Sequence, residues 1–117
     1  MNPEKRKIGW IGTGETSNSL VYQLIRYGYD VTVFDLDEIS TKNLVSLGAK
    51  FAVNAQELAL ASDYLFVSVG REECLKEIFE DKYTGIMSCI KDDAIIIDLS
   101  PRKTDYAKDL KERLWNE

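Results

Sequence analysis

The sequence contains no histidine, only two cysteines and two prolines, and fewer basic than acidic residues. Without histidine there is no imidazole to act as general base, proton shuttle or metal ligand, which excludes most catalytic triads and most zinc sites. Cys74 and Cys89 stand 15 positions apart, a spacing that matches no metal or redox motif. We expect both to be free thiols of an intracellular protein in buried or inert roles, since free cysteine behaves as a small hydrophobe.

Positive charge and long apolar runs are also scarce. The 15 lysines and arginines against 20 aspartates and glutamates give a net charge of -5, so we expect no nucleic acid partner and no anionic membrane partner. No apolar run approaches the ~20 residues of a membrane span, and the N-terminus has no signal-peptide pattern. We therefore expect a cytoplasmic protein. A length of 117 residues, 44% of them hydrophobic, predicts one globular domain over residues 1–117.

Short apolar segments alternate with segments of helical periodicity. Four apolar segments have strand length and little polar alternation, which predicts parallel strands buried on both faces, at residues 8–11, 31–34, 64–69 and 94–97. A further brief strand is predicted at residues 50–53. Helices are predicted at residues 16–27, 38–47, 54–61, 71–80, 83–90 and 104–115. Gly28 and Gly48 supply left-handed helix ends, and Asn54 forms a capping box with Glu57.

Strands that alternate with helices predict an α/β fold, a Rossmann-type doubly wound parallel sheet of about five strands with flanking helices. Such sheets bind ligands at the carboxyl ends of their strands, beside the point where strand order reverses. The residues that directly follow each strand are therefore the candidates for a binding site.

The first strand runs through Gly12-Thr13-Gly14 directly into a helix, which is the context that a dinucleotide fingerprint requires. One glycine allows the tight turn and the next lets the backbone approach a pyrophosphate at the helix N-terminus. Ser17 replaces the third glycine of the pattern. The alternative is a turn that simply needs glycine flexibility.

The second strand ends at Asp35, which follows Gly12 by 23 positions, close to the ~20 expected for an acid that binds the adenosine ribose. Asp35 could accept hydrogen bonds from both ribose hydroxyls, or it could be a solvated strand-end acid or a helix cap. The acidic neighbours Asp37 and Glu38 would repel a 2′-phosphate, so NAD is favoured over NADP. Glu15 places a carboxylate near the pyrophosphate: it either turns to solvent and favours the helix dipole, or it weakens cofactor affinity.

Ordered blocks along residues 7–114 carry a family resemblance. They are Ile8-Gly9-Trp10-Ile11-Gly12-Thr13-Gly14, Leu20, Leu24, Gly28, Tyr29-Asp30-Val31-Thr32-Val33-Phe34-Asp35, Gly48-Ala49, Asp63-Tyr64-Leu65-Phe66 and Ile96-Ile97-Asp98-Leu99-Ser100. The chain resembles the N-terminal NAD(P)-binding domain of the β-hydroxyacid dehydrogenases, the group of 6-phosphogluconate, 3-hydroxyisobutyrate and tartronate semialdehyde reductases. The departures from the family pattern are Glu15-Thr16, Ser17, Gly70 and Pro101.

The resemblance implies residue roles. It places Ser68, Val69 and Gly70 over the nicotinamide side of the cofactor and Ser100 in substrate binding, with an N-cap of the last helix as the alternative for Ser100. The expected cofactor-binding residues are thus Gly12, Thr13, Gly14, Glu15, Thr16, Asp35, Ser68, Val69 and Gly70.

The catalytic lysine of the family lies in sequence beyond the matched part, in later strands and a helical second domain. We therefore expect the NAD(P)-binding domain of an oxidoreductase that acts on a small β-hydroxyacid-like substrate, one that binds cofactor and does not turn over alone. The alternative is a standalone nucleotide-binding or redox-sensing module without catalysis; an interaction domain or a methyltransferase-like protein is further from the pattern. The sheet edge left after the fifth strand favours a homodimer.

Overall fold

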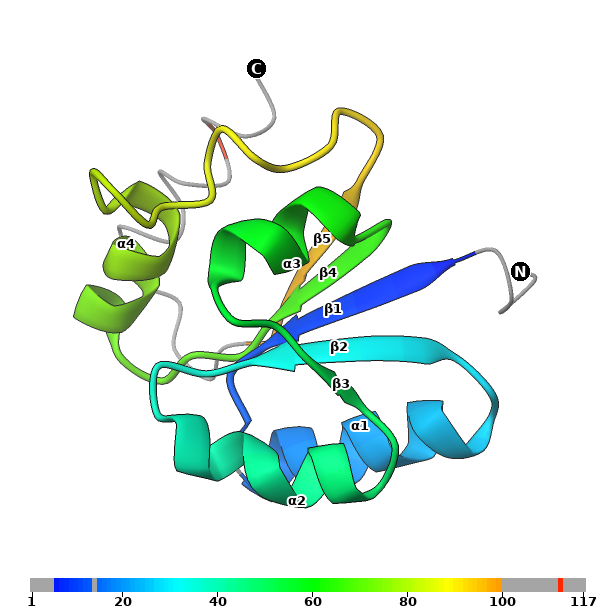
Figure 1. Ribbon diagram of the computed structural model, residues 1–117. Coiled ribbons are helices and arrows are strands. Elements are labelled where there is room, and N and C mark those ends of the chain that lie inside the picture. The colour runs from blue at the N-terminus through cyan, green and yellow to red at the C-terminus, as the bar shows by residue number, and fades with distance from the viewer. Residues whose placement is uncertain (1–5, 14, 100–111, 113–117) are drawn as a thin grey trace.

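Five parallel strands form one sheet in the computed structural model, which describes residues 6–13, 15–99 and 112. The strands are β1 (Lys7–Ile11), β2 (Asp30–Phe34), β3 (Lys50–Phe51), β4 (Tyr64–Val67) and β5 (Ile95–Asp98), in the order β3-β2-β1-β4-β5 (Figure 1). The chain builds outward from β1 to β3, returns to the other side of β1 and continues to β5. The doubly wound Rossmann-type fold is confirmed, and its strand order reverses between β1 and β4.

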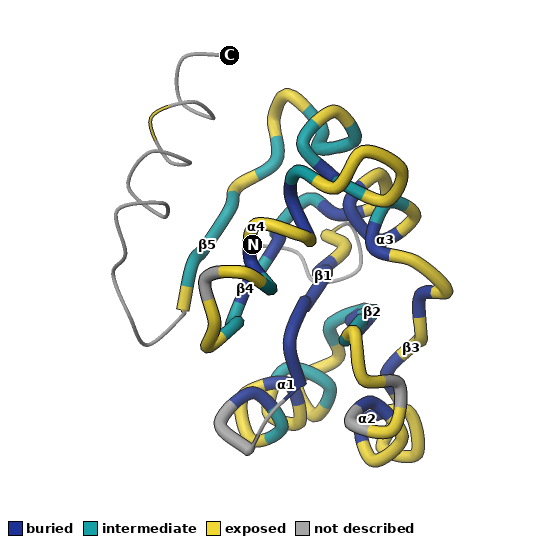
Figure 2. Tube along the Cα trace, turned by 90° about the vertical axis from the view of Figure 1, so that its left-hand side faces the viewer, coloured by how far each residue is buried: buried dark blue, intermediate teal, exposed yellow. Residues whose placement is uncertain are grey.

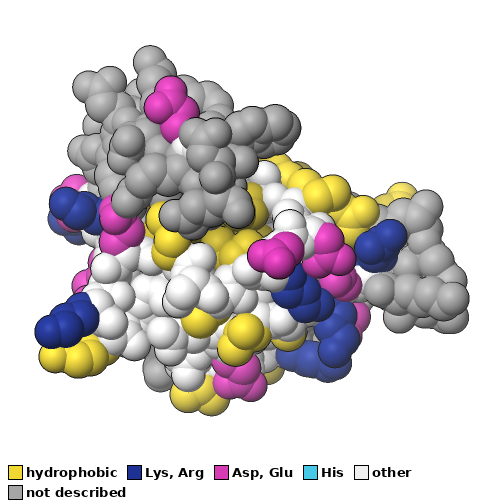
Figure 3. All heavy atoms as spheres, turned by 90° about the horizontal axis from the view of Figure 1, so that it is seen from above, with side chains coloured by type: hydrophobic (Ala, Val, Ile, Leu, Met, Phe, Trp, Pro, Cys, Tyr) yellow, Lys and Arg dark blue, Asp and Glu magenta, His cyan; other side chains and the backbone are white. Residues whose placement is uncertain are grey.

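Helices cover both faces of this sheet. On one face lie α1 (Glu15–Arg26), a 3₁₀ helix (Glu38–Thr41) and α2 (Lys42–Ser46), and on the other lie α3 (Ala55–Ala61) and α4 (Glu72–Glu80) (Figure 1). Each face has its own hydrophobic cluster. One contains Trp10, Val21, Val33 and Leu44, and the other contains Ile11, Leu58, Leu65, Val67, Ile78 and Phe79. Seen from above, the described surface mixes hydrophobic, acidic and basic side chains (Figure 3).

The central strand β1 is buried along almost its whole length, whereas β5 is not (Figure 2). Gly9 of β1 faces α3, where an added Cβ would overlap Ser62 Oγ and lie 2.5 Å from Cδ2 of Leu58. Glycine at this position thus lets α3 pack directly on the sheet. Burial on both faces is wrong for β5, the last strand of the sheet, where Ile95 is 52% exposed.

Local signals set the ends of three helices as expected. Gly28 has φ 89° after α1 and Gly48 has φ 119° after α2, both in the left-handed region that favours glycine. Asn54 caps α3, because its side-chain oxygen accepts a hydrogen bond of 2.8 Å from the backbone N–H of Glu57. The two glycines therefore mark where α1 and α2 end, and Asn54 marks where α3 begins.

The helix predicted over residues 83–90 is wrong, because this segment forms successive turns. Asp81 accepts hydrogen bonds from the backbone N–H groups of residues 83 and 84, which favours a turn. Gly85 fits tightly, since an added Cβ would lie 2.7 Å from the carbonyl oxygen of Phe79. The backbone N–H of Ile86 donates to the carbonyl of Ile78, so the segment hydrogen-bonds back to α4.

Smaller differences concern element length. The helix predicted over residues 38–47 divides into the 3₁₀ helix, capped by Asp37, and the five-residue α2. The strand predicted over residues 50–53 is reduced to two residues. The predicted helix at 104–115 lies, apart from residue 112, outside the described residues. Both cysteines are half-buried free thiols. Within the described part of the chain, we find no helix with the length and hydropathy to cross a membrane.

Candidate functional site

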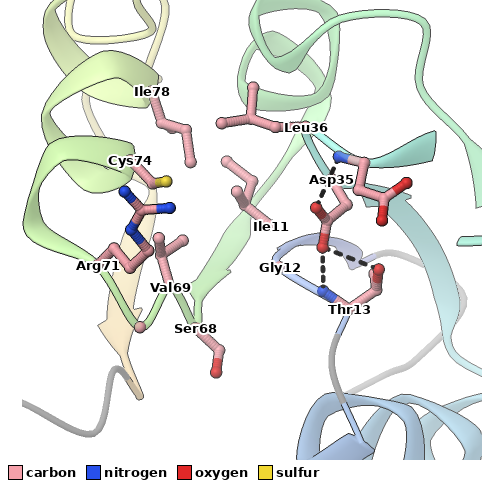
Figure 4. A pocket seen from close by; sticks show the side chains of 12 residues that line it. Ile11, Gly12, Thr13, Asp35, Leu36, Ser68, Val69, Arg71, Cys74 and Ile78 are labelled. Carbon is pink, nitrogen blue, oxygen red and sulfur yellow. Dashed lines mark hydrogen bonds between the residues drawn. The ribbon is translucent and has the colours of Figure 1, made fainter. Parts of the chain in front are cut away.

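A pocket of about 390 Å³ opens at the carboxyl ends of β1, β2 and β4, where the strand order reverses. We call it the carboxyl-end pocket (Figure 4). Its lining residues are Ile11, Gly12, Thr13, Asp35, Leu36, Asp37, Ser68, Val69, Gly70, Arg71, Cys74 and Ile78. The volume lies within the usual range of ligand pockets, and the location is the one that doubly wound sheets use for ligands.

Gly12 directly follows β1 and lies between the carboxyl ends of β2 and β4. Its φ is 98°, its N–H donates to the carbonyl of Phe34 at 2.9 Å, and the N–H of Ser68 donates to the carbonyl of Ile11 at 2.9 Å. A Cβ on Gly12 would overlap the carbonyl oxygen of Ser68. The backbone of the loop between β1 and α1 therefore contacts the backbone of the loop after β4, which only glycine permits.

Asp35 is held in place by donors from two loops. Its Oδ2 accepts hydrogen bonds from the N–H of Thr13 at 2.7 Å and from the hydroxyl of Thr13 at 3.0 Å. Its Oδ1 accepts one from the N–H of Asp37 at 2.9 Å. A carboxylate has about four lone-pair sites, so three are used within the protein and about one is left for a ligand. The buried Thr13 thus orients the acid before any ligand arrives.

Two asparagines connect this loop to the helices of the same face. Asn18 in α1 donates to the carbonyl oxygen of Thr13 at 2.9 Å, and Asn43 in α2 donates to Oδ1 of Asn18 at 3.2 Å. Sequence reasoning missed both, because no periodicity or motif brings residues 18 and 43 together. They tie the position of the loop to the packing of α1 and α2.

The opposite wall comes from the loop after β4 and from α4. It includes Val69, Cys74, Ile78 and Arg71 (Figure 4). Nε and Nη2 of Arg71 donate to Oε1 of Glu73 at 3.1 and 2.7 Å. These hydrogen bonds lower the pKa of Glu73 and raise that of Arg71. Sequence reasoning passed over Arg71, although its position just after β4 is the available signal.

The described residues contain no cluster of three or more cysteine, aspartate and glutamate side chains able to hold a metal ion. The sites predicted from sequence come together in part. Gly12, Thr13, Asp35, Ser68, Val69 and Gly70 line the carboxyl-end pocket. Glu15 and Thr16 begin α1, whereas Gly14 and Ser100 lie outside the described residues.

Residues 7–117 match the family model described as the NAD binding domain of 6-phosphogluconate dehydrogenase. The chain belongs to this family. It is 30% identical over 110 residues to the probable 3-hydroxyisobutyrate dehydrogenase-like 1, mitochondrial, of Arabidopsis thaliana, an alignment that covers 94% of this chain and 33% of the relative. It is 32% identical over 94 residues to the 2-(hydroxymethyl)glutarate dehydrogenase of Eubacterium barkeri, with 80% of this chain and 31% of the relative covered. The chain thus spans about a third of the length of these curated relatives.

Solved structures show the same fold. Psf3 in complex with NADP+ and 2-OPP superposes with a TM-score of 0.85 at 23% identity, covering 93% of this chain and 38% of that one. A V8 variant of the imine reductase from Myxococcus stipitatus in complex with NAD+ gives 0.83 at 18% identity, covering 96% and 38%. Family and fold together identify the chain as an NAD(P)-binding domain of the β-hydroxyacid dehydrogenase-like oxidoreductases.

The carboxyl-end pocket of this family member fits the adenosine part of a dinucleotide. Asp35 offers about one remaining lone-pair site to a ribose hydroxyl. Leu36 and Ile78 contribute apolar side chains to the lining, on which a base could pack. An added Cβ on Gly70 would meet nothing within 4 Å, so the backbone after β4 is open to a ligand.

Proposed function

We propose that the chain binds NAD in preference to NADP and provides the cofactor-binding half of an oxidoreductase that acts on a small β-hydroxyacid-like substrate. The observation that carries the proposal is the Asp35 carboxylate, oriented by Thr13 at the carboxyl-end pocket with Asp37 beside it. A ribose 2′-hydroxyl can donate to Asp35. A 2′-phosphate would instead meet two carboxylates, and like charges at short range repel strongly.

The other residues contribute binding and orientation. Gly12, Thr13 and Gly14 precede α1, which begins with Glu15 and Thr16 and whose N-terminal N–H groups and dipole favour a pyrophosphate. As the family resemblance implies, the loop of Ser68, Val69 and Gly70 lies over the nicotinamide side of the cofactor, and Ser100 contacts substrate. When bound, the dinucleotide supplies hydride-transfer chemistry.

In this proposal, turnover depends on the part of the relatives that lies outside the third of their length that this chain covers. The names of the relatives support the substrate class, since they are described as 3-hydroxyisobutyrate dehydrogenase-like and as 2-(hydroxymethyl)glutarate dehydrogenase. In this proposal the chain alone binds and orients the dinucleotide but does not transfer a proton to the substrate. Steady-state assays with 3-hydroxyisobutyrate should therefore show no turnover by this chain.

Calorimetry with NADH and NADPH tests the cofactor assignment. We expect wild type to bind NADH more tightly than NADPH. Asp35→Ala should weaken NADH binding about tenfold or more, because a hydrogen bond to a charged group contributes about 1.5–3 kcal/mol. It should weaken NADPH binding less, since one repelling carboxylate is removed.

Asp92→Asn is the matched control. Asp92 is exposed and lies before β5, at the end of the sheet opposite the carboxyl-end pocket. Asp92→Asn removes one negative charge, as Asp35→Ala does, but far from the pocket. NADH binding by Asp92→Asn should therefore equal that of wild type. Tighter binding of NADPH by wild type would overturn the NAD preference. No binding of either nucleotide at millimolar concentration would overturn the cofactor assignment to this pocket.

A further inference from the structure

Arg71 precedes α4 and lines the carboxyl-end pocket on the wall opposite Asp35 and Leu36 (Figure 4). Its guanidinium is held by two hydrogen bonds to one carboxylate oxygen of Glu73. The two side chains are 72% and 67% exposed, and an ion pair so exposed adds little to stability. In the structure the pair holds the guanidinium of Arg71 beside the carboxyl-end pocket.

The hydrogen bonds of Arg71 to Glu73 leave two parts of its guanidinium available to a ligand, one edge and the two faces. A guanidinium is a plane whose N–H groups point outward along its edges. Glu73 occupies the edge formed by Nε and Nη2 and offsets the positive charge. The edge formed by Nη1 and the second N–H of Nη2 stays available to an oxygen acceptor such as a phosphate. The faces of the plane, which stack on flat rings, are also left uncovered by the ion pair. Arginine stacks on nucleobases in this manner.

The proposed position of the ribose determines where the base lies. If a ribose hydroxyl donates to Asp35, the attached adenine extends into the part of the pocket between Leu36 and the α4 wall. That wall presents Ile78, Cys74 and the guanidinium of Arg71. A flat base in this position has an apolar side chain on one side and a cationic plane on the other.

We propose that Arg71 is a specificity-determining residue that stacks on the adenine base of the dinucleotide, and that Glu73 is the positioning residue that sets the plane of its guanidinium. This inference rests on the proposed function, because it takes the ribose position from Asp35. It assigns adenine recognition to the α4 wall and ribose recognition to the β2 end of the pocket.

Calorimetry with NADH, AMP and nicotinamide mononucleotide separates the two halves of the ligand. Arg71→Ala and Arg71→Lys should both weaken AMP and NADH binding about two- to fivefold, the size of a cation–π contact at an exposed site. Neither should change binding of the mononucleotide. Lysine keeps the charge and loses the plane, so its failure to rescue distinguishes stacking from charge attraction. Lys76→Ala, which removes an exposed positive charge on α4, should leave the binding of AMP, NADH and the mononucleotide unchanged.

Glu73 needs a readout of its own. Glu73→Ala should weaken AMP binding, and Glu73→Gln should restore it, because glutamine keeps an acceptor for the guanidinium. Urea unfolding should be unchanged in all four variants of Arg71 and Glu73, since these side chains are exposed.

Full affinity for AMP in Arg71→Lys or Arg71→Ala would overturn the stacking role. If Asp35→Ala still weakened NADH binding in that case, the proposed function would stand and only this inference would fail. Absence of NADH binding by wild type would overturn both.

Discussion

Substitution of Gly12 by alanine tests whether contact between the two loops builds the carboxyl-end pocket. The added Cβ would overlap the carbonyl oxygen of Ser68. That residue cannot move freely, because its N–H donates to the carbonyl of Ile11 at 2.9 Å. The mutant must therefore separate the ends of β1 and β4 or strain the loop between β1 and α1.

Gly28→Ala is the matched control for backbone strain. Gly28 has φ 89°, close to the 98° of Gly12, but a Cβ there would meet nothing within 4 Å. A left-handed conformation costs a non-glycine residue about 1–2 kcal/mol, partly offset by a less flexible unfolded chain. We expect Gly28→Ala to lose about 1 kcal/mol. Overpacking adds about 1–3 kcal/mol, so Gly12→Ala should lose about 2–4 kcal/mol.

Urea unfolding and NADH calorimetry on the two variants provide the readout. With a denaturant dependence of about 2 kcal/mol per molar urea, the midpoint of Gly12→Ala should fall about 1 M below that of Gly28→Ala. NADH affinity should fall more than tenfold in Gly12→Ala and stay unchanged in Gly28→Ala, which alters the far end of α1. Equal losses of stability in the two variants would refute the loop-contact argument, as would wild-type NADH affinity in Gly12→Ala.

Three further predictions test the scaffold. Hydrogen bonds from the backbone N–H at the start of β1 and from Lys91 lower the pKa of Asp63. The charged carboxylate therefore stabilises the fold at pH values above its ordinary pKa of 3.8. This contribution is lost as the pH falls through the lowered pKa. Asp63→Asn should cost about 1 kcal/mol at pH 7 in urea unfolding, a difference that narrows below about pH 4; a constant difference would contradict it. Gly9→Ala should cost about 1–3 kcal/mol because the added Cβ would overlap Ser62 Oγ and crowd Leu58. Gly9→Ala combined with Ser62→Ala should lose less than the sum of the two single substitutions. Asn54→Ala should cost about 1 kcal/mol through the lost cap of α3, and no loss of helical circular dichroism or stability would argue against the cap.

The parts of the fold that sequence predicted are those specified by neighbouring residues. Gly28 and Gly48 end helices because their positive φ is a local requirement. Asn54 caps α3 because its acceptor lies three residues from the N–H that it binds. The sequence predicts the strand segments because a strand buried on both faces, such as β1, contains almost no polar residues.

The errors occur where distant contacts decide the structure. Residues 83–90 have helical spacing, but their backbone N–H groups at Ile86 and Met87 donate to carbonyls of α4. A helix would need those donors for itself. The edge strand β5 begins with three isoleucines, an apolar run like that of β4. Only its place in the strand order shows that Ile95 is half-exposed.

The two walls of the carboxyl-end pocket differ for the same reason. The β1–β2 side follows a spacing along the chain, from Gly12 to Asp35, because the crossover helix between adjacent parallel strands has a nearly fixed length. The α4 side is brought opposite to it by strand order alone, with β4 inserted beside β1 after two intervening strands. Arg71 therefore faces Asp35 across the pocket, although the number of residues between them gives no indication of it. The residues beside Asp35, from which the NAD preference is deduced, form one wall of the pocket that the adenosine would occupy, and Arg71 belongs to the other wall.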